Sequence, residues 1–592
     1  MTATVDEIDD IALDLSSGHG SRAGIAALTG GLLELRAILV RTLLTVAADE
    51  AAIDAAAGLH EAYWRLAALQ PDHPEVVSSM LCYPNTGPWL NHVLRRFAAE
   101  SDDSRTPLWA DCGYLGWLAA SAGILAGTQG QARLVIRNGE VMLPGLGMAV
   151  LGADDHCGHC ELHWTATGAL HFRWDTGSLR IESPTEETRT GWLPLRTARV
   201  ESDEITVWLD DLDPFRHRES AGSALPRLNA QQAQRWQRDF EQAWQLLRRD
   251  HDHYLTPMRG CLRSLSPLSA EAMVDSSSYT SANGAGCVYT TAATDSCQLA
   301  LTLIHEVQHT KFGLLTDQVE LFDPDPECRF YAPWRDDPRP ILGLMHGIYA
   351  FFGVVDFWRV HRHSDCHGSL QAHADFELWR TQLVGAITQA RASGLLTAAG
   401  TRFLDGLTAA MRSWSGEEVP ATARQAAIES SLAHRVFWSV RNLTPDPVAI
   451  AELTACWDAE RRAPTRILLA DRVDQRTLPD HYRSLRLAAQ LTTVDATAAA
   501  ALADSRQPEG DRAYLAGYPS EAMALYSREL RVDPLRPQAW AGLALAVSKV
   551  HGHHAVRVLT DRAAVAARLY QSVGPEVEIL DLLLWLSAGS DA

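Results

Sequence analysis

Residues 300–313 have the sequence ALTLIHEVQHTKFG, which contains the motif His305-Glu306-Val307-Gln308-His309. In a helix, side chains four residues apart point the same way, so the imidazoles of His305 and His309 can reach one metal ion. The apolar residues before the motif would bury the helix. The sequence therefore predicts a metal-binding helix. The same pattern is typical of zinc peptidases, in which the glutamate is the general base.

A catalytic metal also needs a third protein ligand and an open position. Extended metallopeptidase motifs place a histidine six residues after the second one, and this chain has Leu315 there, which excludes that class. Asp317 would lie about 12 Å along an intact helix, out of reach of the ion. We therefore expect the third ligand from a later helix. His346 is the first candidate and Asp356, which would complete a two-histidine, one-carboxylate set for Fe(II), is the second. The alternative is that His346 is a hydrogen-bonded core histidine.

A proline-rich connector, residues 323–340, lies between these helices and contains Arg335 and Arg339. Because a guanidinium group binds a carboxylate through a planar fork, the two arginines are candidates for anchoring a dicarboxylate cosubstrate. The alternative is that they pair with Asp336, Asp337 or a helix end. A peptidase has little need of such a segment, so the arginines favour a different metal chemistry.

Hydrophobic periodicity predicts an α+β fold that is mostly α-helical. We expect four segments: N-terminal helices in residues 1–128, a small antiparallel β unit in 129–215, a helical metal-binding catalytic domain in 216–500 and tetratricopeptide-like helices in 501–592. The first hairpin of the β unit is predicted to turn at Asn138-Gly139. The tail shows too few repeats to stand alone, so it should pack on the preceding helices.

The 592-residue chain has 52 basic residues (Lys and Arg) against 73 acidic ones (Asp and Glu), a formal net charge of −21. Because an acidic chain repels nucleic acids and anionic membranes, we expect neither as a partner. The N-terminus, MTATVDEIDDIALDL, lacks the features of a signal peptide. The longest apolar run, residues 341–355, is interrupted by glycines and a histidine and is too short to span a bilayer. The expected location is the cytoplasm.

The ten cysteines do not form the pattern of a disulfide framework. One cluster, His156-Cys157-Gly158-His159-Cys160, contains residue types that bind zinc. Its ligands are too crowded for the usual spacing of a structural zinc site. We interpret this segment as an exposed loop with reduced thiols, and a metal at Cys157 and Cys160 is the alternative.

The stretch LTLIHEVQHTK, together with FYAPWRDDPRPILGLMHGIYAFFGVVDFWR, resembles the HExxH family of peptide-modification proteins that occur beside ribosomally made peptides. Members are described as 2-oxoglutarate- and Fe(II)-dependent peptide β-hydroxylases, and some are fused to radical SAM peptide maturases. The resemblance is specific around residues 300–360 and softer over the N-terminal helices, the β unit and the tail. The chain has no radical SAM CxxxCxxC cluster, so it would be a stand-alone member with such a maturase as a candidate partner.

The resemblance implies that His305 and His309 bind Fe(II), that 2-oxoglutarate chelates the same ion, and that O₂ is the oxidant. The implied reaction hydroxylates the β-carbon of a residue in a precursor peptide, and Glu306 would orient a ligand rather than act as a base. The edge of the β unit or a groove in the tail could take the peptide. Two alternatives stay open: a zinc metallopeptidase with Glu306 as general base, and a non-catalytic peptide-binding scaffold with a structural metal.

Overall fold

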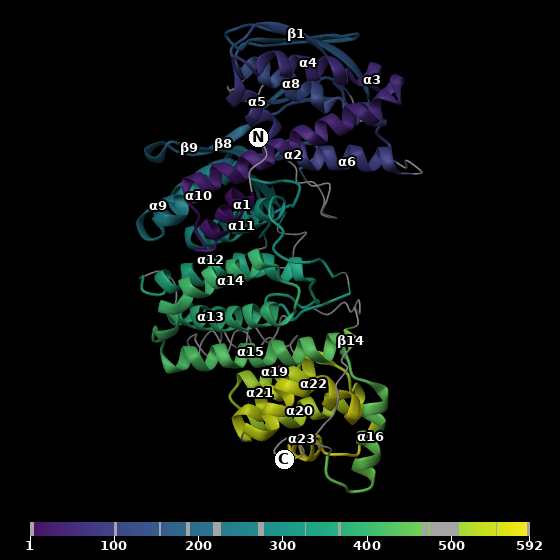
Figure 1. The fold of residues 1–592 in the computed structure, drawn as a ribbon, viewed down its shortest axis with the longest axis vertical. Helices are drawn as coiled ribbons and strands as arrows, with labels where there is room; N and C mark the ends of the chain where they lie inside the picture. Colours follow the sequence, from purple (N-terminus) through teal and green to yellow (C-terminus); the bar gives the residue numbers. More distant parts are fainter. Residues whose placement is uncertain are drawn as a thin grey trace. The chain divides into compact units, whose positions relative to one another are not determined.

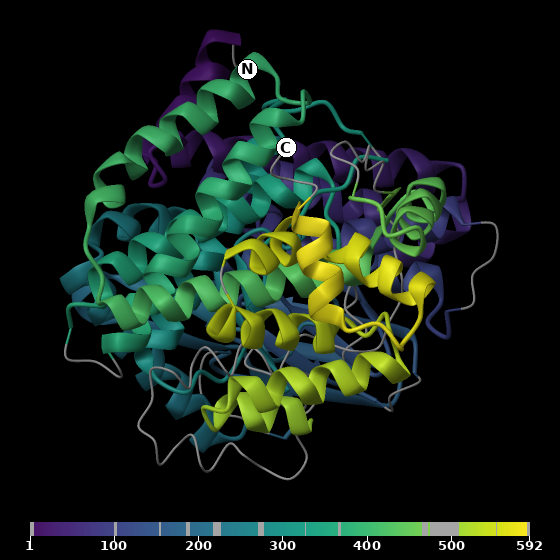
Figure 2. The ribbon, with the colours of Figure 1, turned by 90° about the horizontal axis from the view of Figure 1, so that it is seen from below.

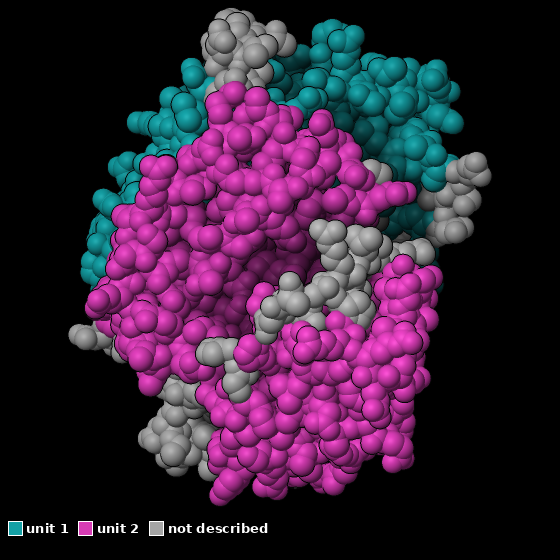
Figure 3. Space-filling model, turned by 60° about the horizontal axis from the view of Figure 1, so that its bottom comes forward, with its two compact units in different colours: residues 1–320 teal, residues 321–592 magenta. Residues whose placement is uncertain are grey.

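The chain forms two compact units, Met1–Glu320 and Leu321–Ala592 (Figure 3). The computed structural model describes residues 5–99, 104–152, 156–184, 190–216, 227–269, 278–325, 327–364, 369–463, 472–473, 508–551 and 553–588 (Figure 1). The predicted class, α+β and mostly helical, is confirmed. The boundary between the units lies inside the predicted segment 216–500, so the metal motif belongs to the first unit and His346 to the second.

Unit 1 begins with the predicted helices. They are α1 (Val5–Leu15), α2 (Arg22–Ala48), α3 (Ala51–Ala57), α4 (Leu59–Leu69), α5 (Pro74–Leu81), α6 (Thr86–Ala98), α7 (Leu108–Cys112) and α8 (Tyr114–Leu125). Ser21 caps α2 by accepting a hydrogen bond from the Gly24 amide. Helix α8 is buried over nearly its whole length and packs under the first strand, β1 (Gly130–Ile136), as Figure 1 shows. This contact is the centre of the unit's core.

Two antiparallel sheets follow. One has the order β1-β4-β5-β6, with β4 (Gly158–Trp164), β5 (Leu170–Trp174) and β6 (Gly177–Ile181); the other has the order β2-β3-β7, with β2 (Glu140–Leu143), β3 (Gly147–Val150) and β7 (Trp192–Pro194). The predicted hairpin is wrong in its pairing. Asn138 and Gly139 do form the turn, with φ of 50° and 79°. Only the bridge Arg137–Glu140 continues it, however, because β1 pairs with β4 while β2 pairs with β3.

A third sheet is mixed, and it corrects the prediction of a purely antiparallel unit that ends at residue 215. Its order is β11-β12-β10-β9-β8, with β8 (Arg196–Val200), β9 (Ile205–Leu209), β10 (Ser264–Leu268), β11 (Ser278–Tyr279) and β12 (Cys287–Thr291). Strand β10 runs parallel to both β9 and β12. Parallel neighbours need a crossover, which helices α9 (Ala230–Asp250) and α10 (Leu255–Cys261) supply between β9 and β10. Helix α11 (Ser296–Thr316), which carries the metal motif, follows β12 directly.

Unit 2 is almost entirely helical within the described residues. Its helices are α12 (Ile341–His361), α13 (Ser369–Ala392), α14 (Ala398–Ala410), α15 (Ala421–Asn442), α16 (Pro447–Asp458), α19 (Glu509–Leu515), α20 (Pro519–Val532), α21 (Pro537–Val550), α22 (His553–Val573) and α23 (Ile579–Ala588). The tail helices lie against α15 (Figures 1 and 2), and Phe437, Trp540 and Leu559 share one core. The expectation that the tail packs on the preceding helices is therefore confirmed, and its likeness to tetratricopeptide repeats stays a prediction.

Two helices of the described chain, α2 and α12, are long and apolar enough to cross a membrane by length and composition alone. Helix α2, however, carries the buried Arg36, whose guanidinium donates a hydrogen bond to the Asn283 carbonyl of the same unit. In α12, 72% of the apolar window is buried inside the protein. Both features fit helices in the core of a soluble protein.

Candidate functional site

The metal motif lies in the middle of α11, as the sequence predicts. Asp295 caps the helix by accepting a hydrogen bond from the Gln298 amide. The rings of His305 and His309 face each other nearly at right angles, with their centroids 4.7 Å apart. Burial lowers the pKa of His305, which keeps its imidazole in the neutral form that binds metals. The helix thus presents two neighbouring imidazoles on one face.

Glu306 points to a different partner, the edge strand β11. Its buried carboxylate accepts a hydrogen bond from the Ser278 hydroxyl at 2.6 Å on one oxygen and from the Thr280 hydroxyl at 2.6 Å on the other. Charge-assisted hydrogen bonds of this length are strong, so the glutamate fixes the register of α11 against the mixed sheet. Sequence reasoning missed both hydroxyl donors, which come from the Ser- and Thr-rich stretch before the motif.

The same helix also holds the loop between α1 and α2. The Gln308 side chain donates to the Gly18 carbonyl at 3.0 Å, and the Lys311 ammonium donates to the carbonyls of Gly18 at 3.1 Å and His19 at 2.8 Å. Burial lowers the pKa of Lys311 to about 7, against the opposing effects of Cys261 and Asp14. Gln308 and Lys311, two and five positions after Glu306, therefore tie an N-terminal loop to the motif helix.

His19, in this loop, forms a second pair of imidazoles with His253. Their ring centroids are 4.4 Å apart, and the Tyr254 ring lies 5.1 Å from His19. A ring nitrogen of His19 lies within 4.8 Å of one of His253. Neither histidine belongs to a motif that the sequence offers, because they are far apart in the chain and only the loop clamp brings them together.

The other predicted site residues belong to unit 2. Arg335 and Arg339 approach the same carboxylate, that of Asp337, at 3.0 and 3.4 Å, which is the alternative that the sequence left open; their role toward a cosubstrate stays a prediction. His346 is half-buried on α12, and burial lowers its pKa to about 4. Asp356, on the same helix, is buried and accepts a hydrogen bond from Arg359 at 3.0 Å.

The prediction of an exposed loop at the cysteine cluster is wrong in part: His156 and Cys157 precede β4, whereas Gly158, His159 and Cys160 belong to it. Cys160 lies in β4 with its side chain in the core, and burial raises the pKa of its thiol to about 12. Cys157 lies 3.6 Å from the Asn138 side chain, and the His159 ring is 2.7 Å from the Ala56 carbonyl. Within the described residues, these side chains form no group with metal-binding geometry.

No protein-family model and no curated protein matches the chain. The resemblance to the peptide-modification family therefore stays an expectation from the motif and its surroundings. What the structure adds is the arrangement around α11: two facing imidazoles, and a glutamate held by hydroxyl groups of the neighbouring sheet.

Proposed function

We propose that the chain is an Fe(II)- and 2-oxoglutarate-dependent oxygenase that hydroxylates the β-carbon of a residue in a ribosomally synthesised precursor peptide. The observation that supports an oxygenase over a peptidase is the position of Glu306. A peptidase needs this carboxylate to accept a proton from the attacking water. Here both of its oxygens already accept hydrogen bonds from Ser278 and Thr280, and the side chain is buried.

The donor set fits a metal of this kind. His305 and His309 would hold Fe(II) through neutral imidazoles, because their rings face each other and burial disfavours protonation of His305. Imidazole nitrogen suits iron and zinc alike, so the ligands alone do not choose between these ions. When bound, Fe(II) with 2-oxoglutarate and O₂ supplies the oxidation of a C–H bond, and 2-oxoglutarate is converted to succinate and CO₂.

The chain's own residues hold this helix in place. Glu306 is a positioning residue, because its hydrogen bonds to Ser278 and Thr280 fix the rotation of α11 and thus the direction of both histidines. Gln308 and Lys311 add contacts to the Gly18 loop from another side of the helix. Metal sites whose supporting contacts are lost typically bind metal tens of times more weakly.

The first test needs no peptide. The protein is loaded with Fe(II) without oxygen, 2-oxoglutarate is titrated in, and the visible absorption spectrum is recorded. We expect a charge-transfer band that saturates with 2-oxoglutarate and is absent in His305→Ala and His309→Ala variants. The His60→Ala variant, which changes a surface histidine on α4, is the control and should keep the band. The same titration of a His346→Ala variant tests the third ligand that the sequence predicts.

A second test separates the oxygenase from the peptidase. Glu306→Gln keeps the shape of the side chain but cannot act as a base. An oxygenase should retain part of its 2-oxoglutarate turnover and its iron, whereas a peptidase should lose all hydrolysis. Tight retention of zinc, with no band on adding 2-oxoglutarate and with cleavage of peptides by the wild type, would refute the proposal. Retention of a metal with neither activity would support a scaffold with a structural ion.

A further inference from the structure

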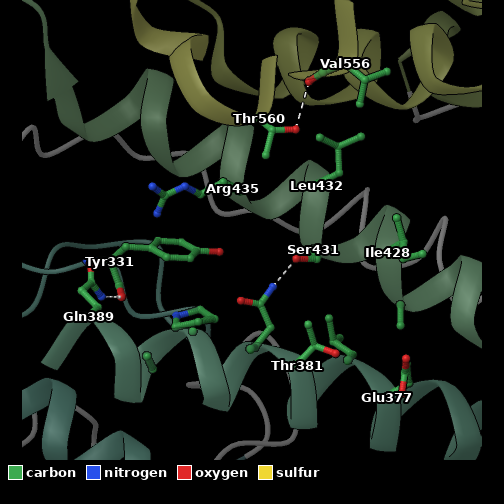
Figure 4. Close-up of a pocket in the computed structure, with 16 residues that line it drawn as sticks. Tyr331, Glu377, Thr381, Gln389, Ile428, Ser431, Leu432, Arg435, Val556 and Thr560 are labelled. Atoms are coloured by element: carbon green, nitrogen blue, oxygen red, sulfur yellow. Dashed lines mark hydrogen bonds between the residues drawn. The ribbon is translucent and has the colours of Figure 1, made fainter. Parts of the chain in front are cut away.

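Unit 2 contains a groove with a volume of about 500 Å³ that no part of the proposed metal chemistry uses (Figure 4). Its walls are formed by α13 and α15, with α22 above and the connector segment around Tyr331 at one end. Figure 4 shows the order of side chains along it. Arg435, Tyr331 and Gln389 lie at one end, Ser431 lies in the middle, and Glu377 lies at the other end. Ser431 accepts a hydrogen bond from the Gln382 side chain.

The groove runs along two helices. On α13 the lining residues recur on one face from Glu377 to Gln389, and on α15 from Ala427 to Arg435. At a rise of about 1.5 Å per residue, these walls are about 18 and 12 Å long. An extended peptide advances about 3.3 Å per residue, so the groove matches about four or five residues of an extended chain.

The α13 wall of the groove leaves room for a peptide backbone. Gly385 lines it in the middle of α13, and a Cβ added there would meet no atom within 4 Å. The apolar side chains of Leu432 and Val556 line the walls, and Ile428 is 54% exposed. Exposed apolar groups around bare backbone are features of a surface that another chain covers.

The two ends differ in charge. Glu377 is already neutralised, because Arg380 binds one of its oxygens and Arg424 lies 3.7 Å from the other. Arg435, in contrast, contacts no carboxylate within the described chain. Its guanidinium stacks on the Tyr331 ring, 4.5 Å from the centroid. The groove therefore has a positive end that the described chain leaves without a counter-charge.

This positive end is preorganised. The Tyr331 hydroxyl lies 2.8 Å from Nδ1 of His434, and Gln389 donates to the Tyr331 carbonyl at 2.7 Å. The ring under Arg435 is thus held at its hydroxyl and at its backbone. A guanidinium stacked on a fixed ring loses little freedom when it binds a carboxylate, which favours binding.

We propose that this groove docks a segment of the peptide substrate in which an acidic residue is followed by apolar residues. Its carboxylate binds Arg435, and its apolar side chains lie along Ile428, Leu432 and Val556. The inference rests on the proposed function for the nature of the occupant, a peptide. The length of the walls favours a peptide over a compact carboxylate, because a small acid would fill only the Arg435 end.

The test selects ligands with the protein itself. A displayed library of random dodecapeptides is enriched on the metal-free full chain, and the enriched peptides are synthesised with a fluorescent label. Their binding is measured by fluorescence polarisation to wild type, Arg435→Ala and Gly385→Leu. The control variants are Arg412→Ala, which removes an exposed arginine, and Val384→Leu, which adds bulk to the exposed face of α13. Gly385→Leu should fold, because leucine is a better helix former than glycine; a thermal melt of each variant checks this.

We expect enriched peptides with Asp or Glu beside apolar residues, and a loss of affinity of about tenfold or more in Arg435→Ala. Gly385→Leu should lose binding, while both controls bind as wild type does. Replacing the acidic residue of the peptide by its amide should weaken binding to wild type but not to Arg435→Ala. No enrichment, or peptides that bind all variants equally, would overturn the proposal. Displacement of the peptide by decanoate, with decanoate itself binding as tightly, would assign the groove to a small carboxylate instead.

The His305→Ala, His309→Ala double variant separates this proposal from the metal chemistry. It should bind the selected peptides as wild type does. Peptide binding by the wild type without a 2-oxoglutarate band would support the groove and refute the oxygenase. A 2-oxoglutarate band in the wild type, together with peptide binding that is unchanged in Arg435→Ala, would support the oxygenase and refute the groove.

Discussion

Charged side chains have opposite kinds of surroundings in the interior around α11 and in the groove of unit 2. On α11, the carboxylate of Glu306 and the ammonium of Lys311 are each bound by two groups of the same unit. In the groove, the guanidinium of Arg435 rests on an aromatic ring and has no carboxylate within the described chain. A charge that the fold satisfies serves the fold. A charged group that only stacks on an aromatic ring, without an oppositely charged partner, is available to bind a ligand.

The largest effect is expected from removing the donors of Glu306. Ser278→Ala with Thr280→Val leaves a buried carboxylate without its two hydroxyl groups. The free energy of unfolding should fall by about 3–5 kcal/mol, because hydrogen bonds to a buried charge contribute most where water cannot replace them. Chemical denaturation measures this change. Thr45→Val, on the exposed face of α2, is the control and should stay within about 0.5 kcal/mol. A shift as small as that of the control would show that the Glu306 contacts do not support the fold.

Two arginines of unit 2 test the comparison directly. Arg362 is buried, binds the Glu417 carboxylate and donates to the Glu418 carbonyl at 2.9 Å. Arg362→Leu should lower the free energy of unfolding by about 2 kcal/mol, because it breaks a partly buried ion pair. Arg435→Leu removes only the cation–π contacts with Tyr331 and Trp438 and should cost about 1 kcal/mol or less. Equal losses in thermal or urea unfolding would contradict the distinction between charges that serve the fold and those that face a ligand.

The smallest effect is a pH dependence from Asp213. Burial, and next the charge of Asp210, raise the pKa of this carboxyl from 3.8 to about 7. Because the folded state then holds a proton that the unfolded state has lost, the contribution to stability is present below about pH 4 and falls as the pH rises through 7. Between pH 6 and 8 the loss should be about 1 kcal/mol. The difference between wild type and Asp213→Asn, followed by urea unfolding across this range, isolates it; parallel curves would exclude this titration.

Much of the fold follows from local signals. Asn229 forms a capping box with Gln232 at the start of α9, and Pro107 is the N-cap of α7. Pairing of strands does not follow, because it depends on contacts between distant residues. The turn at Asn138-Gly139 is correct, but its two strands separate into different sheets.

The candidate site divides in the same way. Spacing alone places His305 and His309 on one face of α11. The hydrogen bonds of Glu306 come from Ser278 and Thr280, nearly thirty residues earlier in the chain, and no sequence motif predicts this contact. The groove is harder still, since Tyr331, Gln389, Arg435 and Val556 come from four separate elements. The lining face of α13 mixes polar side chains with Leu378, Gly385 and Ala386, so its pattern does not set it apart from an ordinary helix face.

The whole chain contains only two lysines, Lys311 and Lys549, and this has a practical use. Lys549 is 34% exposed, beside Glu429, whereas Lys311 is fully enclosed by its carbonyl partners. Amine-reactive dyes should therefore label Lys549 and spare Lys311 in the native protein. A protease that cuts after lysine should cleave at Lys311 only when α11 opens, so the rate of that cut would measure how often the helix opens. A slower cut after adding Fe(II) and 2-oxoglutarate is expected if the proposed function is correct.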